Sequence, residues 1–295
     1  MLIRHKYVEG SDWHTIPDPV GSKKYDGAAF ALNFDSEGKP SFISRRESVK
    51  GGFPDRTEKL PHLSDVRLPE FAGRGYHVEL IHSGWNPEDE ESHANISGIL
   101  NSLPPKAIGT QKTIGPVRAV LLDAVFPKDL PTYESKMEHL KILEQAFNKP
   151  GLVFTPEYHI GQEAVSRLVE ETKNRDSEGV IVTSLKTPET LNVRHKVKHF
   201  GTYNLKVSKI MQEVDIKGSP KQSAGALLLV DANNREVCAV GSGFTKEQRA
   251  AIWKNPKEWL GRHVQIKAMS STANRLRHPV FNGDADGDLD VVEHK

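Results

Sequence analysis

A lysine followed by an Asp-Gly pair stands close to the start of the sequence, in the stretch KKYDGA, where Lys24 occupies the first position of K-x-D-G. A neutral lysine amine can attack phosphorus and form a phosphoramidate, but its unperturbed pKa is about 10.4, so its surroundings must favour the free amine. Lys23 can supply positive potential, and Asp26 with Gly27 can form a tight turn close to a bound nucleotide. A charged surface turn is the other interpretation, and K-x-D-G occurs by chance in roughly one chain of this length in fifteen. The motif therefore needs support from residues further along the chain.

Attack on a nucleoside triphosphate also needs carboxylates for a divalent metal ion, cations for the phosphates and an acceptor for the ribose hydroxyls. The sequence offers Glu79 in YHVELI, on an expected strand, and Glu178 in SEGVIV, at an expected helix-to-strand turn. Lys196 and Lys198 in HKVKH share one face if that piece is extended, because strand side chains alternate. A solvated basic strand edge is the alternative interpretation of these two lysines.

The elements that position these residues are read from apolar periodicity. AAFALNF and PSFISRR flank the turn DSEGK and predict a hairpin, whose open end brings Lys24 and Arg45 together. RGYHVELIHSG, AVLLDAVF and GVIVTS predict further strands, and helical spacing appears in DEESHANISGILNSL, PTYESKMEHLKILEQAF and GQEAVSRLVEETKNR. Strands, hairpins and helices mixed in this way predict an α+β domain built on antiparallel sheet, over residues 1–202.

The pattern changes near Tyr203. NLKVSKIMQEVD, AGALLLVDA, REVCAVGSG and HVQIKAMSS predict strands, interrupted by one helix that begins at Thr245 with Gln248 in a capping box. A run of strands with one inserted helix predicts a small five-stranded OB-type barrel over residues 203–295.

Composition excludes several classes of protein. The chain has 295 residues, 37% of them hydrophobic and 27% charged, a net charge of +1 and one cysteine, Cys238. An internal disulfide is therefore excluded, and we expect a reducing, cytoplasmic setting with no secretion signal and no membrane span. Three separated basic stretches, SRRESVKGG, VRHKVKH and ANRLRHP, are either solvated faces or the lining of one groove for a polyanion.

The order K-x-D-G, S-R, a strand glutamate, E-G-V and K-x-K resembles the nucleotidyltransferase motifs of ATP-dependent DNA ligases and of their capping-enzyme and RNA-ligase relatives. VGSGFTKEQRAAIW and RLRHPVF are similar to stretches of the OB domain of DNA ligases. The resemblance runs from about residue 20 to about residue 282. It implies a nucleotidyltransferase (adenylation) domain followed by an OB-fold domain. The length suggests a minimal ligase of the phage or bacterial accessory type, without a further N-terminal DNA-binding domain.

The resemblance also implies a role for each matched residue. It makes Lys24 the catalytic, adenylated nucleophile, and it places ATP contacts at Arg45, Glu79, Lys196 and Lys198, metal ligands at Glu178 and Glu79, and DNA contacts at Arg45, Arg275 and Arg277. The implied cofactors are ATP with Mg²⁺ or Mn²⁺. The implied partner is nicked double-stranded DNA, bound by a monomer.

Four positions depart from the ligase pattern. Ala29 stands where many DNA ligases have an arginine for the nick phosphate, and Leu122 stands where an aromatic residue commonly stacks on adenine. Glu79 follows His-Val instead of an acidic residue and glycine, and NGDADGDLD replaces the closing R-x-D-K. Nick recognition and the handling of pyrophosphate are the steps that these departures put in question.

Other functions remain open from the sequence. An RNA ligase or a capping-type guanylyltransferase would share the lysine chemistry, and a non-catalytic nucleic-acid-binding relative would share the fold. DADGDLD is better interpreted as a solvated acidic tail than as a calcium loop, because its glycine falls one place early for an EF-hand. His77, Glu79 and His82 are interpreted as strand residues rather than as a zinc site, because His82 falls on the other face.

Overall fold

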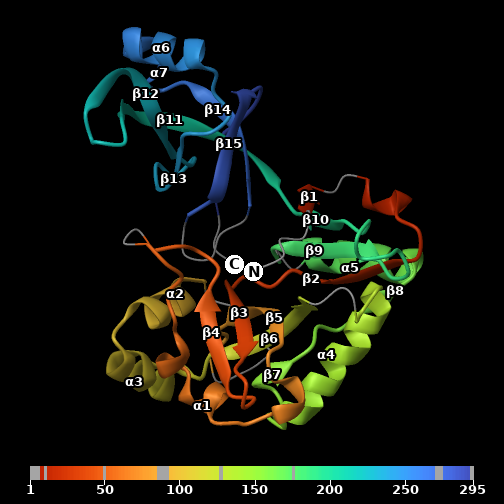
Figure 1. Ribbon diagram of the computed structural model, residues 1–295. Coiled ribbons are helices and arrows are strands. Elements are labelled where there is room, and N and C mark those ends of the chain that lie inside the picture. Colours follow the sequence, from red (N-terminus) through yellow and green to blue (C-terminus); the bar gives the residue numbers. More distant parts are fainter. Residues whose placement is uncertain are drawn as a thin grey trace. The chain divides into compact units, whose positions relative to one another are not determined.

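The computed structural model describes residues 7–9, 12–48, 51–84, 93–125, 129–174, 177–269 and 275–292 (Figure 1). The chain divides into two compact units, Met1–Lys198 and His199–Lys295. The helices are α1 (Pro61–Ser64), α2 (His93–Asn101), α3 (Pro104–Ile114), α4 (Tyr133–Phe147), α5 (Gln162–Asn174), α6 (Lys246–Lys254) and α7 (Pro256–Trp259). Short 3₁₀ helices span Trp13–Thr15, Thr57–Lys59 and Pro69–Phe71. None of the helices in these described ranges is long and apolar enough to cross a membrane.

One sheet of the first unit carries the lysines singled out in the sequence, and we call it the lysine sheet. Its strands, in spatial order, are β1 (Tyr7–Glu9), β10 (Arg194–Lys198), β9 (Gly179–Ser184), β2 (Pro19–Lys23) and β8 (His159–Ile160). All pairs are antiparallel except β1 with β10. Val165 and Leu168 of α5 pack with Val180 and Val182, so α5 covers one face of this sheet and the other face is left for polar groups.

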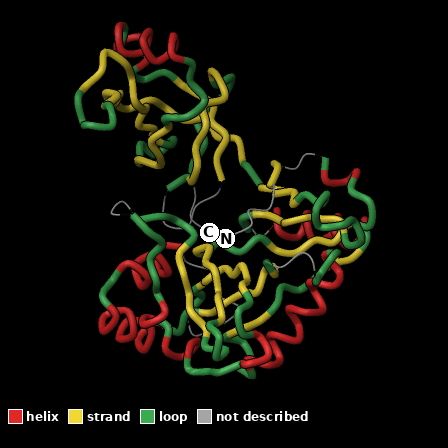
Figure 2. The backbone as a smooth tube through the Cα atoms, viewed as in Figure 1, coloured by secondary structure: helices red, strands yellow, loops and turns green. Residues whose placement is uncertain are grey.

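The second sheet of the first unit holds the main core, and we call it the core sheet. Its strands, in spatial order, are β4 (Pro40–Ser44), β3 (Ala28–Phe34), β5 (Gly75–Ile81), β6 (Arg118–Ala124) and β7 (Val153–Phe154). Alternate residues of β3, among them Leu32, are buried with residues of α2 and α4, including Ile96 and Leu140. The chain passes from β2 of the lysine sheet directly into β3 of the core sheet, so the K-x-D-G segment joins the two groups of strands (Figure 2).

The mixed α+β architecture with antiparallel sheets is confirmed for the first unit, and the β3–β4 hairpin forms as predicted. Its turn is held by the Asp35 side chain, whose Oδ1 accepts hydrogen bonds from the backbone N–H groups of Glu37 and Lys39. The four-residue helices α1 and α7 were not predicted from the sequence, and neither was α3, because its segment contains Gly109 and few apolar residues at helical spacing. The acidic stretch expected to begin α2 lies outside the described residues.

The second unit is one sheet that curls until its edges meet. Its strands, in spatial order, are β13 (Glu236–Val240), β12 (Pro220–Val230), β11 (Gly201–Val214), β14 (His263–Met269) and β15 (Arg277–Asp284). The two edge strands approach each other through a parallel bridge between Ser242 and Val280. The predicted capping box of α6 is confirmed: the Thr245 hydroxyl accepts from the Gln248 N–H, and the Gln248 side chain accepts from the Thr245 N–H.

The two stretches of the second unit that resemble DNA ligases pack against each other. The rings of Phe244 and Phe281 stack with centroids 4.4 Å apart. Gly243 has φ +90°, and a Cβ there would lie 2.4 Å from the Phe281 carbonyl oxygen, so only glycine allows this approach. Trp253 and Trp259 pack against the core of the same unit. Packing between the two stretches therefore explains why they contain Gly243, Phe244 and Phe281.

The acidic stretch near the end of the chain is solvated at Asp284, Asp286 and Asp288, as expected, but it is anchored to the second unit and is not a free tail. Asp284 belongs to β15 and pairs with Arg262 at 2.5 Å. Asp290 accepts a hydrogen bond of 2.6 Å from the Asn204 backbone N–H, and its own carbonyl accepts from Ala232. The expectation of a free tail was wrong because Asn282 and Gly283, which resemble turn residues, and Asp284, the first acidic residue, belong to β15, which pairs with β14.

Candidate active site

Lys24 lies at the end of β2, directly against the strand that follows Glu178. Its backbone N–H donates to the Gly179 carbonyl at 2.8 Å, which continues the pairing of β2 with β9. Its Nζ forms an ion pair with Oε1 of Glu178, and the two side chains are 19% and 12% exposed. The K-x-D-G lysine and the E-G-V glutamate, 154 positions apart in the numbering of the sequence (178 − 24), are thus in direct contact.

The glycines of both motifs allow close approaches of backbone. A Cβ on Gly27 would lie 2.3 Å from the Leu80 carbonyl oxygen of β5, and one on Gly179 would lie 2.0 Å from the Val197 carbonyl oxygen of β10. Gly179 also has φ +139°, which disfavours any side chain. These two glycines let the segments that carry Lys24 and Glu178 pass close to the neighbouring strands.

Glu79 joins this pair from the core sheet. It lies on β5 opposite Ala29 of β3, and its side chain is partly buried. Burial raises the pKa of the Glu79 carboxyl to about 7; Lys24 and Arg45 act in the opposite direction, and Glu178 and Asp26 raise it further. All four charged side chains lie close enough to Glu79 to shift the pKa of its carboxyl, so the structure brings them together around it.

Arg45 follows β4 at the open end of the hairpin. Its backbone N–H lies 3.4 Å from the Ala29 carbonyl oxygen, so it stands beside the first residues of β3. The guanidinium is close enough to Glu79 to lower the pKa of that carboxyl. Arg45 therefore belongs to the same constellation as Lys24 and Glu79, on the side contributed by the core sheet.

Lys196 and Lys198 occupy β10, which is antiparallel to β9. Lys198 lies opposite Gly179, the residue after Glu178, and Lys196 lies opposite Ile181. Residues two apart on a strand share a face, so the two lysines project on the same side, as predicted. Both are partly buried. The register puts Lys198 next to the turn that holds Glu178.

Leu122, the position where an aromatic residue was expected, lies at an irregularity of β6. The register shifts so that Val78 pairs with Leu121 and His77 with Asp123, which leaves Leu122 as the extra residue of a β-bulge. Bulges of this kind re-aim a side chain and are common beside active sites. Ala29 shares a face with its cross-strand partner Glu79, so an arginine at position 29 would have projected toward this site.

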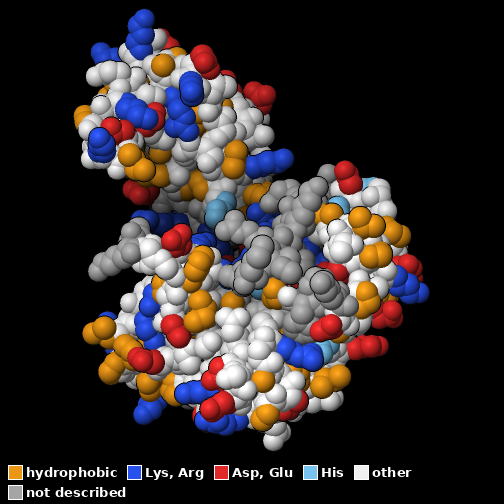
Figure 3. Space-filling model, viewed as in Figure 1, with side chains coloured by type: hydrophobic (Ala, Val, Ile, Leu, Met, Phe, Trp, Pro, Cys, Tyr) orange, Lys and Arg blue, Asp and Glu red, His pale blue; other side chains and the backbone are white. Residues whose placement is uncertain are grey.

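The two predicted DNA-binding arginines, Arg275 and Arg277, lie in the second unit. Arg275 is exposed and precedes β15, whose first residue is the partly buried Arg277. On the face of this unit that Figure 3 shows, Lys and Arg side chains are interspersed with Asp and Glu side chains and do not form a single basic stripe.

The two carboxylates at the site, Glu178 and Glu79, suit a metal ion that takes most of its ligands from water and from phosphate oxygens. In the described part of the chain, no group of three or more His, Cys, Asp or Glu residues is placed to hold a metal ion. Magnesium in nucleotide sites uses one or two carboxylates and completes its shell with water and phosphate oxygens. Glu178 and Glu79 fit that donor set. The negative charge of Glu178 is close enough to raise the pKa of the Glu79 carboxyl.

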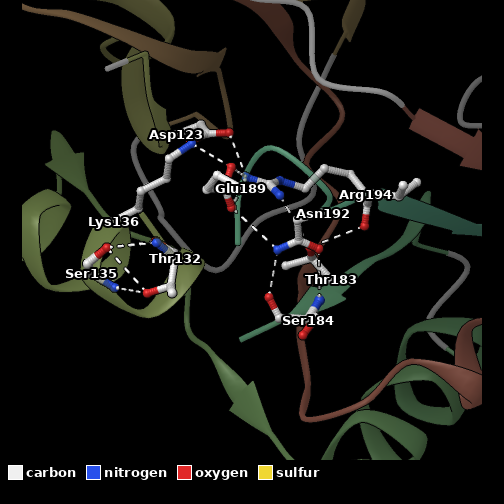
Figure 4. Close-up of polar contacts among 10 residues, drawn as sticks. Asp123, Thr132, Ser135, Lys136, Thr183, Ser184, Glu189, Asn192 and Arg194 are labelled. Carbon is white, nitrogen blue, oxygen red and sulfur yellow. Dashed lines mark hydrogen bonds and ion pairs between the residues drawn. The ribbon is translucent and has the colours of Figure 1, made fainter. Parts of the chain in front are cut away.

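A second set of charged residues in this unit was missed by sequence reasoning. Four charged residues are buried together between the lysine sheet and the core sheet (Figure 4): Asp123, Lys136, Glu189 and Arg194. The available signal was the spacing of α4: Lys136 stands four residues before Leu140, on the apolar face of the helix. A lysine at such a core position predicts a buried anionic partner.

Comparisons with known proteins show the fold. No family model matches the sequence, and no curated protein matches it. A solved structure described as "DNA binding with a minimal scaffold: Structure-function analysis of Lig E DNA ligases" has a TM-score of 0.67 and 15% identity, covering 96% of this chain and 100% of that one. The structure Pmar-Lig_PreS3 has a TM-score of 0.69 and 16% identity, covering 95% of this chain and 67% of that one. The chain therefore has the fold of a DNA ligase, as its motifs predicted.

Proposed function

We propose that the protein is an ATP-dependent DNA ligase that seals nicks in duplex DNA through a lysyl-AMP intermediate. The observation that carries this proposal is the direct contact between Lys24 and Glu178, with Glu79 and Arg45 in the same electrostatic environment. A nucleophile, two carboxylates and a cation converge from two sheets, and the fold around them is that of Lig E DNA ligases. A non-catalytic binding protein would have no need to keep this combination.

The proposed reaction has three steps. The Lys24 amine loses a proton and attacks the α-phosphorus of ATP; a P–N bond forms, and the P–O bond to pyrophosphate breaks. The 5′-phosphate at a nick then attacks the same phosphorus, which breaks the P–N bond and gives an adenylated DNA end. Finally the 3′-hydroxyl attacks the 5′-phosphate and expels AMP. The Lys24–Glu178 ion pair must open before the first step, since a protonated amine has no free electron pair.

The remaining site residues bind and orient the substrates in this proposal. Lys196 and Lys198 contact the phosphates of ATP, Glu79 accepts from the ribose, and Arg45 binds the ribose or the DNA phosphate. Glu178, with Glu79, holds Mg²⁺ or Mn²⁺, which when bound offsets the negative charge that develops on the transferred phosphoryl group. No general base is assigned beyond these groups, so positioning and electrostatics supply most of the rate.

We infer that the adenylation domain ends near residue 202 and that the second unit is an OB-type barrel that binds duplex DNA. The order of its strands supports this: the first strand, β11, pairs with β12 and β14, and the third and fifth strands meet at the Ser242–Val280 bridge. Its helices α6 and α7 fall between the third and fourth strands. Arg275 and Arg277 would contact the DNA backbone, a type of contact that makes binding weaken steeply with salt.

The choice of nucleotide tests the proposal. Full-length protein mixed with Mg²⁺ and ATP labelled in the α-phosphate is expected to retain label after denaturation, and a chase with nicked duplex DNA is expected to move that label to the DNA. GTP labelled in the same way is expected to give at least about tenfold less labelling. Preferential labelling by GTP would identify a capping-type guanylyltransferase instead, and absence of label from both nucleotides would favour a non-catalytic relative.

A further inference from the structure

Four charged side chains of the first unit are almost completely buried. One of them, Arg194, lies on the strand that also carries Lys196 and Lys198 of the candidate active site. Lys136 is 0% exposed, Arg194 2%, Asp123 3% and Glu189 8%. They come from different elements: α4, β10, β6 and the segment between β9 and β10 respectively. We call them the buried charge cluster.

The contacts within the buried charge cluster are close and reciprocal (Figure 4). Lys136 Nζ lies 2.7 Å from both Asp123 Oδ1 and Glu189 Oε2. Arg194 Nη2 donates to Asp123 Oδ2 and Glu189 Oε2, each at 3.0 Å, and its guanidinium lies over the Tyr133 ring, 4.6 Å from the centroid. Burial alone would raise the pKa of Glu189, but Arg194 and Lys136 hold it below its ordinary value. Two cations and two anions therefore neutralise each other.

The position of Arg194 links this cluster to the candidate active site. Arg194, Lys196 and Lys198 alternate along β10 and share a face. Lys196 stands roughly 7 Å and Lys198 roughly 13 Å from Arg194 along the strand, from the rise per residue. At the other end of the contact, Asp123 pairs across the core sheet with His77, which shares a face of β5 with Glu79. The cluster thus ties the lysine-bearing strand to the strand pair that carries Glu79.

Stability alone does not account for this arrangement. Burying four charges has a large desolvation cost, and apolar side chains of similar volume commonly give equal or greater stability. What the Arg194 guanidinium adds is geometry: its Nη2 donates to both carboxylates and its Nη1 donates to the Thr183 hydroxyl at 3.3 Å, which fixes its direction as well as its distance. β10 has only four residues paired with β9, so a fixed point at its first residue restricts how the rest of the strand can shift.

We propose that Arg194 is a positioning residue, whose anchorage to Asp123 and Glu189 sets the place of Lys196 and Lys198 for the phosphates of the nucleotide. This inference rests on the proposed function, since it takes the two lysines as the phosphate-binding groups. Lys136 provides the matched comparison. It is as deeply buried and has the same two anionic partners, but it lies on α4 and carries no phosphate-binding neighbour.

Two charge-balanced double variants test the proposal. Arg194→Met/Asp123→Asn and Lys136→Met/Asp123→Asn each remove one cation and one anion, and each leaves the remaining cation paired with Glu189. The ATP concentration that half-saturates self-labelling is expected to rise at least tenfold in the Arg194 variant and less than threefold in the Lys136 variant. Both variants are assayed at a temperature at which thermal unfolding shows each of them to be fully folded. An equal rise in both variants would overturn the proposal.

A thermodynamic cycle with Lys196 and Lys198 gives a readout that a purely structural role would not move. In a Lys196→Ala/Lys198→Ala background, the Arg194 double variant is expected to change half-saturating ATP by less than threefold, because both sets of changes remove the same contacts. Independent, multiplying effects would contradict the proposal.

If the Arg194 double variant does not fold, Arg194→Lys keeps the charge and removes the guanidinium. A parental half-saturating ATP concentration in that variant would overturn the proposal, and a rise of threefold or more would support it. Failure of the parental protein to take label from ATP would instead reject the proposed function itself.

Discussion

Replacing Lys24 with alanine is expected to abolish covalent attachment of AMP, with a loss of at least about a thousandfold in labelling rate. Lys24 combines an ion pair with Glu178 and a position where the chain passes from the lysine sheet to the core sheet. The measurement is retention of α-phosphate label on the denatured protein. Because the nucleophile is not needed once the DNA end carries AMP, Lys24→Ala is expected to keep measurable sealing of a pre-adenylated nick.

Lys23→Ala is the matched control for that variant. Lys23 precedes the nucleophile directly, and its ammonium lies over the Tyr25 ring, 5.5 Å from the centroid. Labelling is expected to persist in this variant, within about tenfold of the parental rate, because side chains alternate along an extended segment and the Lys23 ammonium lies over the Tyr25 ring. Normal labelling of Lys24→Ala, or equal loss in both variants, would contradict the assignment of Lys24.

Replacing Glu178 with alanine is expected to slow both self-adenylation and the sealing of pre-adenylated nicks, each by about 10–100-fold, as loss of a metal ligand does. The two reactions separate the two roles that its position allows. If Glu178 only held the Lys24 ammonium, the sealing of a pre-adenylated nick, which makes no use of that amine, would proceed at the parental rate.

Glu171→Ala controls for the removal of a negative charge from the same part of the chain. Glu171 is exposed on α5, away from the polar face of the lysine sheet, and the change is expected to leave both rates within about twofold. A parental rate of sealing by Glu178→Ala in Mg²⁺ would show that Glu178 is not a metal ligand.

The sequence predicted the parts of this molecule that local patterns determine. Alternating or continuous apolar residues indicated β3, β5 and β9, and the capping box at Thr245 indicated where α6 begins. The motif order indicated that Lys24 and Glu178 would meet, although no local pattern relates residues so far apart in the chain. That expectation depended on resemblance to a family.

The parts that were missed depend on tertiary contacts. β15 contains Pro279 and Gly283, which resemble turn residues, yet the strand forms because pairing with β14 overrides their local preference. The buried charge cluster has no signature in any single segment. The sequence around Lys136 is that of an ordinary exposed helix, and its burial depends on two partners, Asp123 on β6 and Glu189 in the segment between β9 and β10.

The central claim is that this chain joins DNA, and nick sealing tests it most directly. Full-length protein with ATP and Mg²⁺ should be incubated with a duplex DNA carrying one nick with a labelled 5′-phosphate, and in parallel with single-stranded RNA of the same sequence. The account predicts conversion of the nicked DNA to the sealed length, joining of the RNA slower by at least about a hundredfold, and loss of sealing when ATP is omitted from protein freed of bound AMP. Efficient joining of the RNA ends, with the nicked DNA left open, would contradict it.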